Sequence, residues 1–166
     1  MSTNRKGAIA EAAIAHHALR AGFDVYRPVF EGGRCDLIFG EPGGRLSRVQ
    51  CKWATLDGDV IRVGARTARR TRDGQRFTVY GAEEIDWLAA YCAELDRCYL
   101  LPIEVVAGQQ VVHLRCAPAR NNQAKGLHWA AQYELGAIAQ LGERRAGSAK
   151  VAGSSPASST VVEAAP

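Results

Sequence analysis

The chain has 166 residues, of which 47% are hydrophobic and 23% are charged, and this composition is typical of a globular protein with one domain. No apolar run approaches the ~20 residues of a membrane span, and no apolar signal segment follows the polar N-terminus, so we expect a cytoplasmic protein without membrane contacts. Seventeen arginines against four lysines contribute to a net charge of +4. This arginine bias suits a nucleic-acid partner, although a GC-rich genome also produces it.

The first half of the chain alternates between helix and strand signals. An alanine-rich segment at residues 6–21 ends at a glycine and predicts a helix. Short apolar runs between glycines and prolines predict strands, with residues 41–44 forming a turn between two of them. The predicted strands cover residues 23–29, 34–39, 46–53 and 59–63.

The second half predicts one more helix and a hairpin. Ile85, Leu88, Ala89 and Cys92 recur at helical spacing, which predicts a helix over residues 82–95. Two β-rich runs at residues 99–106 and 110–115 are separated by Ala-Gly and predict a hairpin. The resulting order of elements indicates an α/β domain with a mixed β-sheet.

The end of the chain differs in composition from the rest. The last aromatic residue is Tyr133, and 20 of the 31 residues at 136–166 are Ala, Gly, Ser, Thr or Pro. A segment with so little apolar surface to bury does not offset its ordering entropy. We therefore expect a domain over residues 1–135 and a low-complexity, disordered tail over residues 136–166.

The tail also resembles the conceptual translation of a transfer-RNA gene. Residues 153–156, Gly-Ser-Ser-Pro, can be encoded as GGT TCG AGT CCC, a sequence typical of a tRNA T-arm. Residues 138–143 can likewise be encoded by a sequence that looks like a D-arm. We hypothesise that the reading frame runs into a neighbouring tRNA gene, a position common for mobile elements. An ordinary low-complexity tail is the alternative, and the nucleotide sequence distinguishes the two.

Five cysteines, an odd number without a CxxC pair, indicate free thiols in a reducing compartment rather than a zinc site or a disulfide framework. One acidic residue of the first predicted helix is more informative. Helical periodicity places Glu11 on the same face as Ile14 and Ala18. A carboxylate among core positions is unfavourable unless another group binds it. A glutamate at the helix edge with a surface partner is the simpler explanation.

Three polar residues on neighbouring predicted strands form the second informative pattern. Asp36 opens the apolar run 37–39, and Gln50 and Lys52 lie on the next strand, where the two-residue period turns both away from Cys51. If the turn brings Asp36 beside them, carboxylate and amide oxygens converge as ligands for Mg²⁺, with Mn²⁺ as a possible substitute. Lys52 would then orient or help to deprotonate an attacking water. A simple cross-strand ion pair between Asp36 and Lys52 is the alternative.

These features together resemble the PD-(D/E)xK nuclease superfamily, in which an acid on one hairpin strand precedes (D/E)xK on the next. The chain is most similar to the branch of bacterial group I intron homing endonucleases, in which QxK replaces ExK. The resemblance spans about residues 7–135. It rests on Glu11 and on the stretches KGAIAEAAIAHHALRAGFDVYRPV, GGRCDLIFGEPGGRLSRVQCKWA and IDWLAAYCAELDRCYLLPIE.

The resemblance implies a restriction-endonuclease-like core of the α-βββ-α-β type and Mg²⁺-dependent hydrolysis of DNA phosphodiester bonds. By position it implies that Glu11, Asp36, Gln50 and Lys52 are catalytic, and that the first three bind the metal. Gln50 stands in place of an acid, which removes one negative charge from the metal site. Glu11 could supply the missing charge, and Glu41 is a less well-placed substitute. Cys35 stands where many members have proline, a change that matters little because that proline only shapes the backbone.

An arginine-rich segment follows the QxK strand. Residues 62–76 hold six arginines against one acid, and residues 65–75 lack an apolar stripe, which predicts an exposed loop. Arginines and threonines suit contacts to DNA phosphates, although a solvated basic loop without a partner is the alternative. Residues 121–123, Asn-Asn-Gln, either contact DNA or form a turn. The predicted DNA-binding residues are Arg62, Arg66, Arg69, Arg70, Arg72 and Arg76.

The sequence therefore predicts a Mg²⁺-dependent endonuclease that acts on double-stranded DNA and is of the homing-endonuclease type. A junction-resolving or restriction-type nuclease on the same core is one alternative. A DNA-binding relative that no longer cleaves is another. Because cleavage of both strands with one site per chain needs at least two subunits, we expect a homodimer or a higher assembly.

Overall fold

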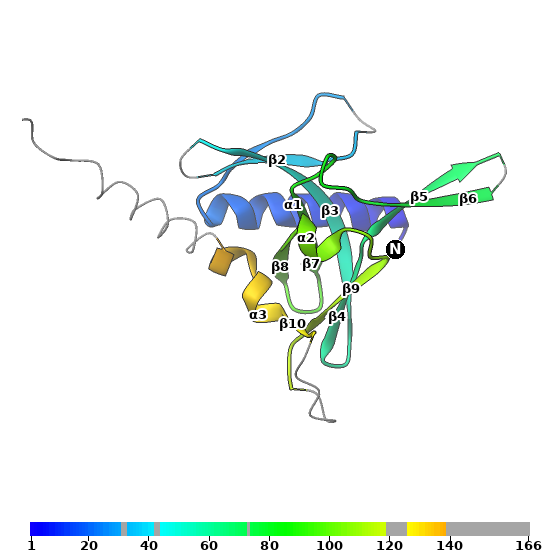
Figure 1. Ribbon diagram of the computed structural model, residues 1–166. Helices are drawn as coiled ribbons and strands as arrows, with labels where there is room; N and C mark the ends of the chain where they lie inside the picture. The colour runs from blue at the N-terminus through cyan, green and yellow to red at the C-terminus, as the bar shows by residue number, and fades with distance from the viewer. Residues whose placement is uncertain (31–32, 42–43, 73, 119–125, 139–166) are drawn as a thin grey trace, which may run out of the picture.

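The computed structural model describes residues 1–30, 33–41, 44–72, 74–118 and 126–138, and for residues 69–71, 75 and 76 it describes the backbone. Its elements are helices packed on a mixed sheet, together with a separate hairpin (Figure 1). In chain order they are α1 (Thr3–Arg20), β1 (Asp24–Tyr26), β2 (Leu37–Gly40), β3 (Leu46–Asp57), β4 (Val60–Gly64), β5 (Arg66–Thr71), β6 (Gly74–Val79), β7 (Trp87–Cys92), β8 (Arg97–Pro102), α2 (Ile103–Val106), β9 (Val111–Arg115), β10 (His128–Trp129) and α3 (Ala130–Tyr133).

Strand β3 is the centre of the sheet because its twelve residues pair with three neighbours. It runs antiparallel to β2 along its first residues and antiparallel to β4 along its last ones. On its other edge it runs parallel to β7, which in turn pairs with β8. Strands β4, β9 and β10 continue the sheet, and β1 pairs with β2 at the opposite end. The candidate site residues on β3 therefore lie in the middle of the sheet.

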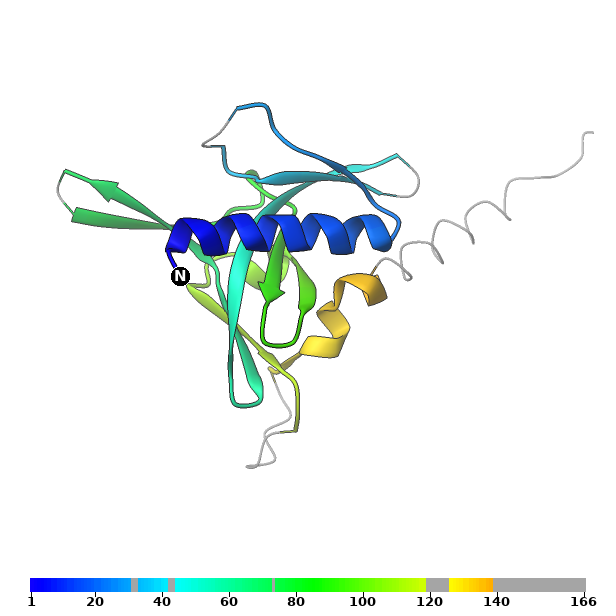
Figure 2. The same cartoon turned by 180° about the vertical axis from the view of Figure 1, so that it is seen from behind.

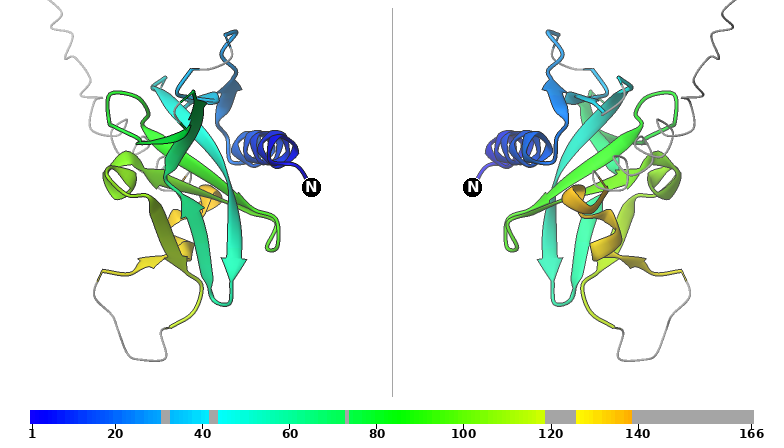
Figure 3. Two further views of the ribbon diagram at one scale, coloured as in Figure 1. Left: turned by 90° about the vertical axis from the view of Figure 1, so that its right-hand side faces the viewer. Right: turned by 90° about the vertical axis from the view of Figure 1, so that its left-hand side faces the viewer.

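Two hydrophobic layers cover the two faces of this sheet. One layer contains the buried residues of α1, Ala10, Ile14 and Ala18, and the other contains residues of α2 and α3. Figures 2 and 3 show α1 lying across one face while α2 lies beyond the other. Strand β8 supplies both layers by alternation, since Leu100 packs in the α1 layer and Leu101 in the other.

The predicted α/β fold with a mixed sheet flanked by helices is confirmed. The predicted helix over residues 6–21 is α1, which begins earlier because the Ser2 side chain accepts a hydrogen bond from the Arg5 backbone N–H at 3.4 Å. The strands predicted around the turn at residues 41–44 are β2 and β3, and the strand predicted over 59–63 is β4. Among the described residues no helix is long and apolar enough to cross a membrane.

The helix predicted over residues 82–95 is wrong, because this segment contains strand β7. Strand β7 lies between β3 and β8, and its residues at positions 88–90 are all buried. A strand covered on both faces shows no alternation of polar and apolar residues, so its sequence pattern does not distinguish it from a helix. The segment therefore adds a strand to the mixed sheet instead of a helix on its face.

The hairpin predicted for residues 99–115 is also wrong. Strand β8 pairs with β7, whereas β9 pairs with β4, and the short helix α2 lies between them in the chain. The arginine-rich segment was expected to be a loop, but it forms the two-stranded hairpin β5–β6. This hairpin projects from the rest of the protein (Figures 1 and 2).

The described part of the chain ends at residue 138. Leu135 is buried in the α1 layer, and Ile138 packs against the same layer. The predicted tail from residue 139 onward and residues 121–123 lie outside the described residues. All five cysteines are free thiols, and Cys51, Cys92 and Cys98 are buried.

Candidate active site

Asp36 is held at the start of β2 by the backbone of the neighbouring strand. Its own N–H donates to the carbonyl of Val49 at 2.9 Å, which extends the β2–β3 ladder by one residue. Its side-chain Oδ2 accepts a hydrogen bond from the Cys51 backbone N–H at 2.8 Å and another from Nε2 of Gln50. The predicted convergence of Asp36 and Gln50 is therefore present in the structure.

The Asp36 carboxylate is partly removed from water. Burial raises its pKa above the usual value, while the Cys51 N–H and the charge of Lys52 act in the opposite direction. Both of its hydrogen bonds from β3 go to Oδ2, so Oδ1 takes no part in them. A partly buried carboxylate whose anionic form is stabilised by hydrogen bonds and nearby cations is able to bind a hard cation.

Gln50 and Lys52 alternate with Cys51 as the two-residue period predicts. Cys51 packs in the layer under α1, whereas Nζ of Lys52 lies over the ring of Tyr80, 5.4 Å from its centroid, in the other layer. Burial lowers the pKa of Lys52, and the nearby Asp36 carboxylate partly opposes that shift. Lys52 is thus an amine close to Asp36 on the face of β3 that α1 does not cover.

Glu11 lies at the edge of the buried stripe of α1. The stripe is formed by Ala10, Ile14 and Ala18, and the Glu11 side chain is 32% exposed. Its Oε2 is 3.3 Å from Nη1 of Arg27, so Glu11 has the surface partner that the simpler explanation required. Glu41 lies at the β2–β3 turn, where it accepts a hydrogen bond from Ser47.

A cleft of about 460 Å³ brings Glu11 and Asp36 together. The same cleft is lined by Arg27 and by residues of the segment between β1 and β2, whereas Gln50 and Lys52 are not among its described lining residues. The reason is geometric: Glu11 approaches from the α1 side, and the side chains of Gln50 and Lys52 lie on the opposite face of β3. Asp36, at the start of β2, is the residue common to both groups.

The donor set of this site suits a divalent hard cation. Glu11 and Asp36 provide carboxylate oxygens in one cleft, and Gln50 carries an amide oxygen beside Asp36. Within the described ranges there is no group of three His, Cys, Asp or Glu residues that could hold a metal. An amide oxygen, contributed by Gln50, would therefore be needed to complete a set of three protein ligands.

The predicted DNA-binding arginines divide into two groups. Arg62 lies on β4, with Nη1 3.9 Å from Oδ2 of Asp57, whereas the other five belong to the hairpin β5–β6 or its turn. The guanidinium of Arg66 stacks over the ring of Phe77 at 3.8 Å, and Arg72 is exposed. The register pairs position 69 with position 76, so two arginines stand opposite each other.

Arg34 connects the hairpin to the site. Its Nη1 donates to Oγ1 of Thr67 on β5 at 3.1 Å, and its Nε lies 2.7 Å from Oε1 of Glu84. Because Arg34 precedes Asp36 by two residues, the base of the hairpin is attached to the segment that carries the candidate metal-binding carboxylate.

No sequence pattern marked Arg27, Arg34 or the Cys51 backbone N–H as parts of this site. Arg27 follows strand β1, and Arg34 precedes strand β2. Neither residue belongs to a periodic pattern of polar and apolar residues. The contact of Cys51 is made by its backbone, which is the same for every residue type except proline. Only the position of Arg27, a charged residue inside the predicted strand 23–29, could have drawn attention to it.

Both the sequence and the structure are similar to those of known proteins. A sequence profile of the PD-(D/E)XK endonuclease family matches residues 1–136. The structure of a bacterial homing endonuclease, I-Ssp6803I, superposes with a TM-score of 0.68 at 25% identity, over 89% of this chain and 97% of that chain. No curated protein matches the sequence. Since the profile covers most of the chain, the protein belongs to the PD-(D/E)XK endonuclease family.

Proposed function

We propose that the protein is a Mg²⁺-dependent endonuclease that hydrolyses phosphodiester bonds of double-stranded DNA and is of the homing-endonuclease type. The observation that carries this proposal is the position of Asp36, which lines one cleft with Glu11 and accepts a hydrogen bond from Gln50. The similarity to a homing endonuclease over 97% of that chain supports the subtype.

Each site residue has a role that its surroundings allow. Asp36 and Glu11 would hold the metal from the cleft, and Gln50 orients Asp36 and adds an amide oxygen. The bound ion would supply charge stabilisation at the phosphate and a more acidic water. Lys52, whose pKa is lowered by burial, is close to Asp36 on the other face of β3, where it would orient a water beside Asp36 and receive its proton when the amine is neutral.

The test uses supercoiled plasmid DNA with Mg²⁺ and with EDTA. We expect the wild type to cleave only with Mg²⁺, and Asp36→Asn and Lys52→Met to lose at least a hundredfold of the rate, with unchanged thermal stability as the check on folding. Arg97→Ala, on β8, is the control and should cleave like the wild type. No cleavage by the wild type, or unchanged cleavage by both site variants, would overturn the mechanism.

One observation favours a second candidate, a relative that binds DNA without cleaving it. Both carboxylates already have partners, since Gln50 donates to Asp36 and Arg27 pairs with Glu11. Such contacts compete with a metal ion for the same oxygens. Binding of a DNA duplex without any cleavage, at Mg²⁺ or Mn²⁺ concentrations up to 10 mM or so, would select this candidate.

We also propose that the protein works as a homodimer or a higher assembly. A single set of Glu11, Asp36 and Lys52 is present among the described residues, and one such site cuts one strand at a time. Sedimentation equilibrium of the full chain should give at least twice the monomer mass of 17.9 kDa. A monomer that nevertheless makes double-strand breaks would contradict this proposal.

A further inference from the structure

Arg27 is a charged residue of the cleft to which neither the sequence nor the family resemblance assigned a role. It follows β1 directly and lines the cleft together with Glu11 and Asp36. Its side chain is 56% exposed, and its Nη1 lies 3.3 Å from Oε2 of Glu11. Burial raises the pKa of Asp36, and the positive charge of Arg27 is the weakest of the contributions that oppose this shift.

The charges of the cleft make a cation necessary for DNA to enter. Two carboxylates are among its described lining residues, and a phosphodiester that approaches them brings a further negative charge. Lys52 lies on the other face of β3, over the ring of Tyr80, and does not line this cleft. Among the described lining residues, Arg27 is the one cation.

The geometry of the guanidinium allows it to bind Glu11 and a phosphate together. The contact with Glu11 runs through Nη1, and an arginine carries five N–H donors in a planar fork. Such a fork matches two oxygens of a phosphate and retains its charge at every physiological pH. An exposed arginine in a surface ion pair loses little stability when part of its guanidinium turns to a ligand, because such pairs contribute little to stability.

We propose that Arg27 is a phosphodiester-binding residue of the active-site cleft, shared between Glu11 and the DNA backbone. This inference rests on the proposed function, since it needs DNA in the cleft. It differs from a role in which Arg27 only holds Glu11 in place for the metal. That role would act through the metal alone, whereas a phosphate contact contributes to DNA binding when no metal is present.

The test is equilibrium binding of a mixed-sequence DNA duplex in EDTA at several salt concentrations. Each phosphate contact adds about 0.9 to the slope of log affinity against log salt concentration. We expect Arg27→Ala to reduce the magnitude of the slope by about 0.9 and Arg27→Lys to retain it. The matched control is Arg97→Ala, because Arg97 is 57% exposed and pairs with Glu134 at 3.1 Å outside the cleft, so its loss should leave the slope unchanged.

Cleavage of plasmid DNA with Mg²⁺ provides the second measurement, in which Arg27→Ala should be at least tenfold slower and Arg97→Ala unaffected. Melting temperatures equal to that of the wild type show that the variants are folded, and Arg27→Gln replaces Arg27→Ala if the latter is not. A slope for Arg27→Ala equal to that of Arg97→Ala overturns the inference while the wild type still binds and cleaves. A wild type that binds no DNA overturns the proposed function and this inference with it.

Discussion

Gln50 donates a hydrogen bond through Nε2 to Oδ2 of Asp36, so the residue that stands in place of the motif's acid is in direct contact with the candidate metal-binding carboxylate. A glutamate at this position has no N–H to donate and places a second negative charge beside Asp36. The Gln50 amide therefore stabilises the site when no metal is bound, whereas a glutamate at this position would stabilise the metal-bound site.

This relationship predicts opposite effects of Gln50→Glu on stability and on metal use. In EDTA we expect the variant to lose roughly 1.5–3 kcal/mol of unfolding free energy, because a hydrogen bond to a charged group is replaced by repulsion. With DNA present, its half-saturating Mg²⁺ concentration should fall about tenfold, because three carboxylates bind the ion more strongly than two. Urea unfolding in EDTA and Mg²⁺ titration of cleavage measure the two effects.

Gln50→Met is the control for this pair of measurements, since it removes the amide and adds no charge. It should be destabilised in EDTA without any gain in Mg²⁺ affinity. A Gln50→Glu variant with the same stability and the same Mg²⁺ requirement as the wild type would contradict the role given to Gln50.

The hairpin β5–β6 should bind DNA through arginines at its base and at its turn, represented by Arg66 and Arg72. Arg66→Ala combined with Arg72→Ala is expected to reduce the salt-dependent slope of duplex binding by about 1.8, because two phosphate contacts are removed. Arg62→Ala should have a smaller effect, since Arg62 lies on β4 beside Asp57. Fluorescence anisotropy at several salt concentrations gives the slopes, and an effect of Arg62→Ala as large as that of the double variant would argue against the hairpin as the main contact.

The Tyr80 hydroxyl predicts a stabilising substitution. Tyr80 is 1% exposed, and its Oη has no hydrogen-bond partner among the described residues. Because a buried polar group without a partner costs about 1–3 kcal/mol, Tyr80→Phe should raise the free energy of unfolding by about 1 kcal/mol.

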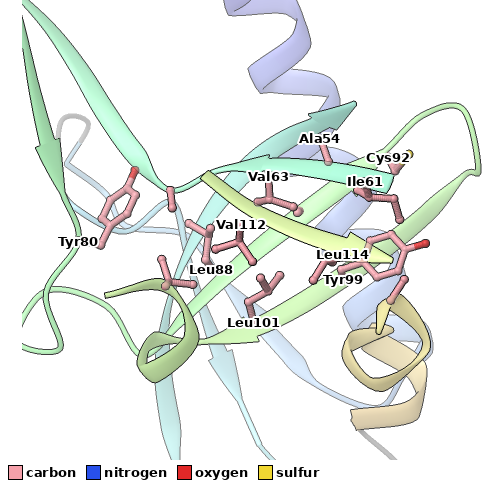
Figure 4. Packing of buried hydrophobic residues seen from close by; sticks show 14 of the residues in the cluster. Ala54, Ile61, Val63, Tyr80, Leu88, Cys92, Tyr99, Leu101, Val112 and Leu114 are labelled. Carbon is pink, nitrogen blue, oxygen red and sulfur yellow. The ribbon is translucent and has the colours of Figure 1, made fainter. Parts of the chain in front are cut away.

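Tyr99 provides the matched control for this substitution. It is 2% exposed in the same hydrophobic layer, and Figure 4 shows it at the opposite end of the cluster from Tyr80. The Tyr99 hydroxyl is not among the buried polar groups that lack a hydrogen-bond partner. Tyr99→Phe should therefore not raise the free energy of unfolding measured in urea. Equal changes in the two variants would show that the unpaired hydroxyl is not responsible.

Asp86 should make the stability of the protein depend on acidic pH. Arg48 donates to it from its backbone N–H at 2.7 Å and from Nε and Nη2 at 3.1 Å each. These contacts lower the pKa of Asp86 below its usual value near 3.8, so their stabilisation is complete above that value and is lost as the pH falls through the lower, folded-state pKa.

We therefore expect Asp86→Asn to be less stable than the wild type by about 1–3 kcal/mol at pH 7. The difference should shrink at pH 3, which lies below the usual pKa of an aspartate, because the stabilisation is lost progressively as the pH falls from that value through the lower folded-state pKa. Urea unfolding at both pH values measures it. Asp57→Asn is the control, because the Asp57 side chain is 75% exposed and its ion pair with Arg62 spans 3.9 Å. A difference that is the same at both pH values would contradict the electrostatic origin.

The candidate site was largely predictable because it is built on local patterns. The strand–turn–strand segment around residues 41–44 sets the distance in sequence between Asp36 and the QxK motif, and the strand period places Gln50 and Lys52 on one face. The amphipathic pattern of α1 likewise located Glu11 next to Ile14 and Ala18. These relations involve residues close in sequence, and local geometry determines them.

Contacts between distant segments were not predictable in this way. The strand β7 resembled a helix in sequence because burial on both faces removed its alternation, and only its pairing with β3 and β8 makes it a strand. The arginine-rich hairpin has no buried residue among those whose side chains the structure describes, and no pattern of hydrophobic residues marked its two strands.

The sequence by itself thus determined the α/β class, the helix that carries Glu11, and the spacing of Asp36, Gln50 and Lys52. The tertiary structure decided that Asp36 joins two sets of residues on opposite faces of β3, that Arg27 pairs with Glu11 across 16 positions, and that Arg34 connects the hairpin to the site. The reason is physical: helix and strand periods are properties of neighbouring residues, whereas an ion pair between distant segments exists only once the sheet has brought them together.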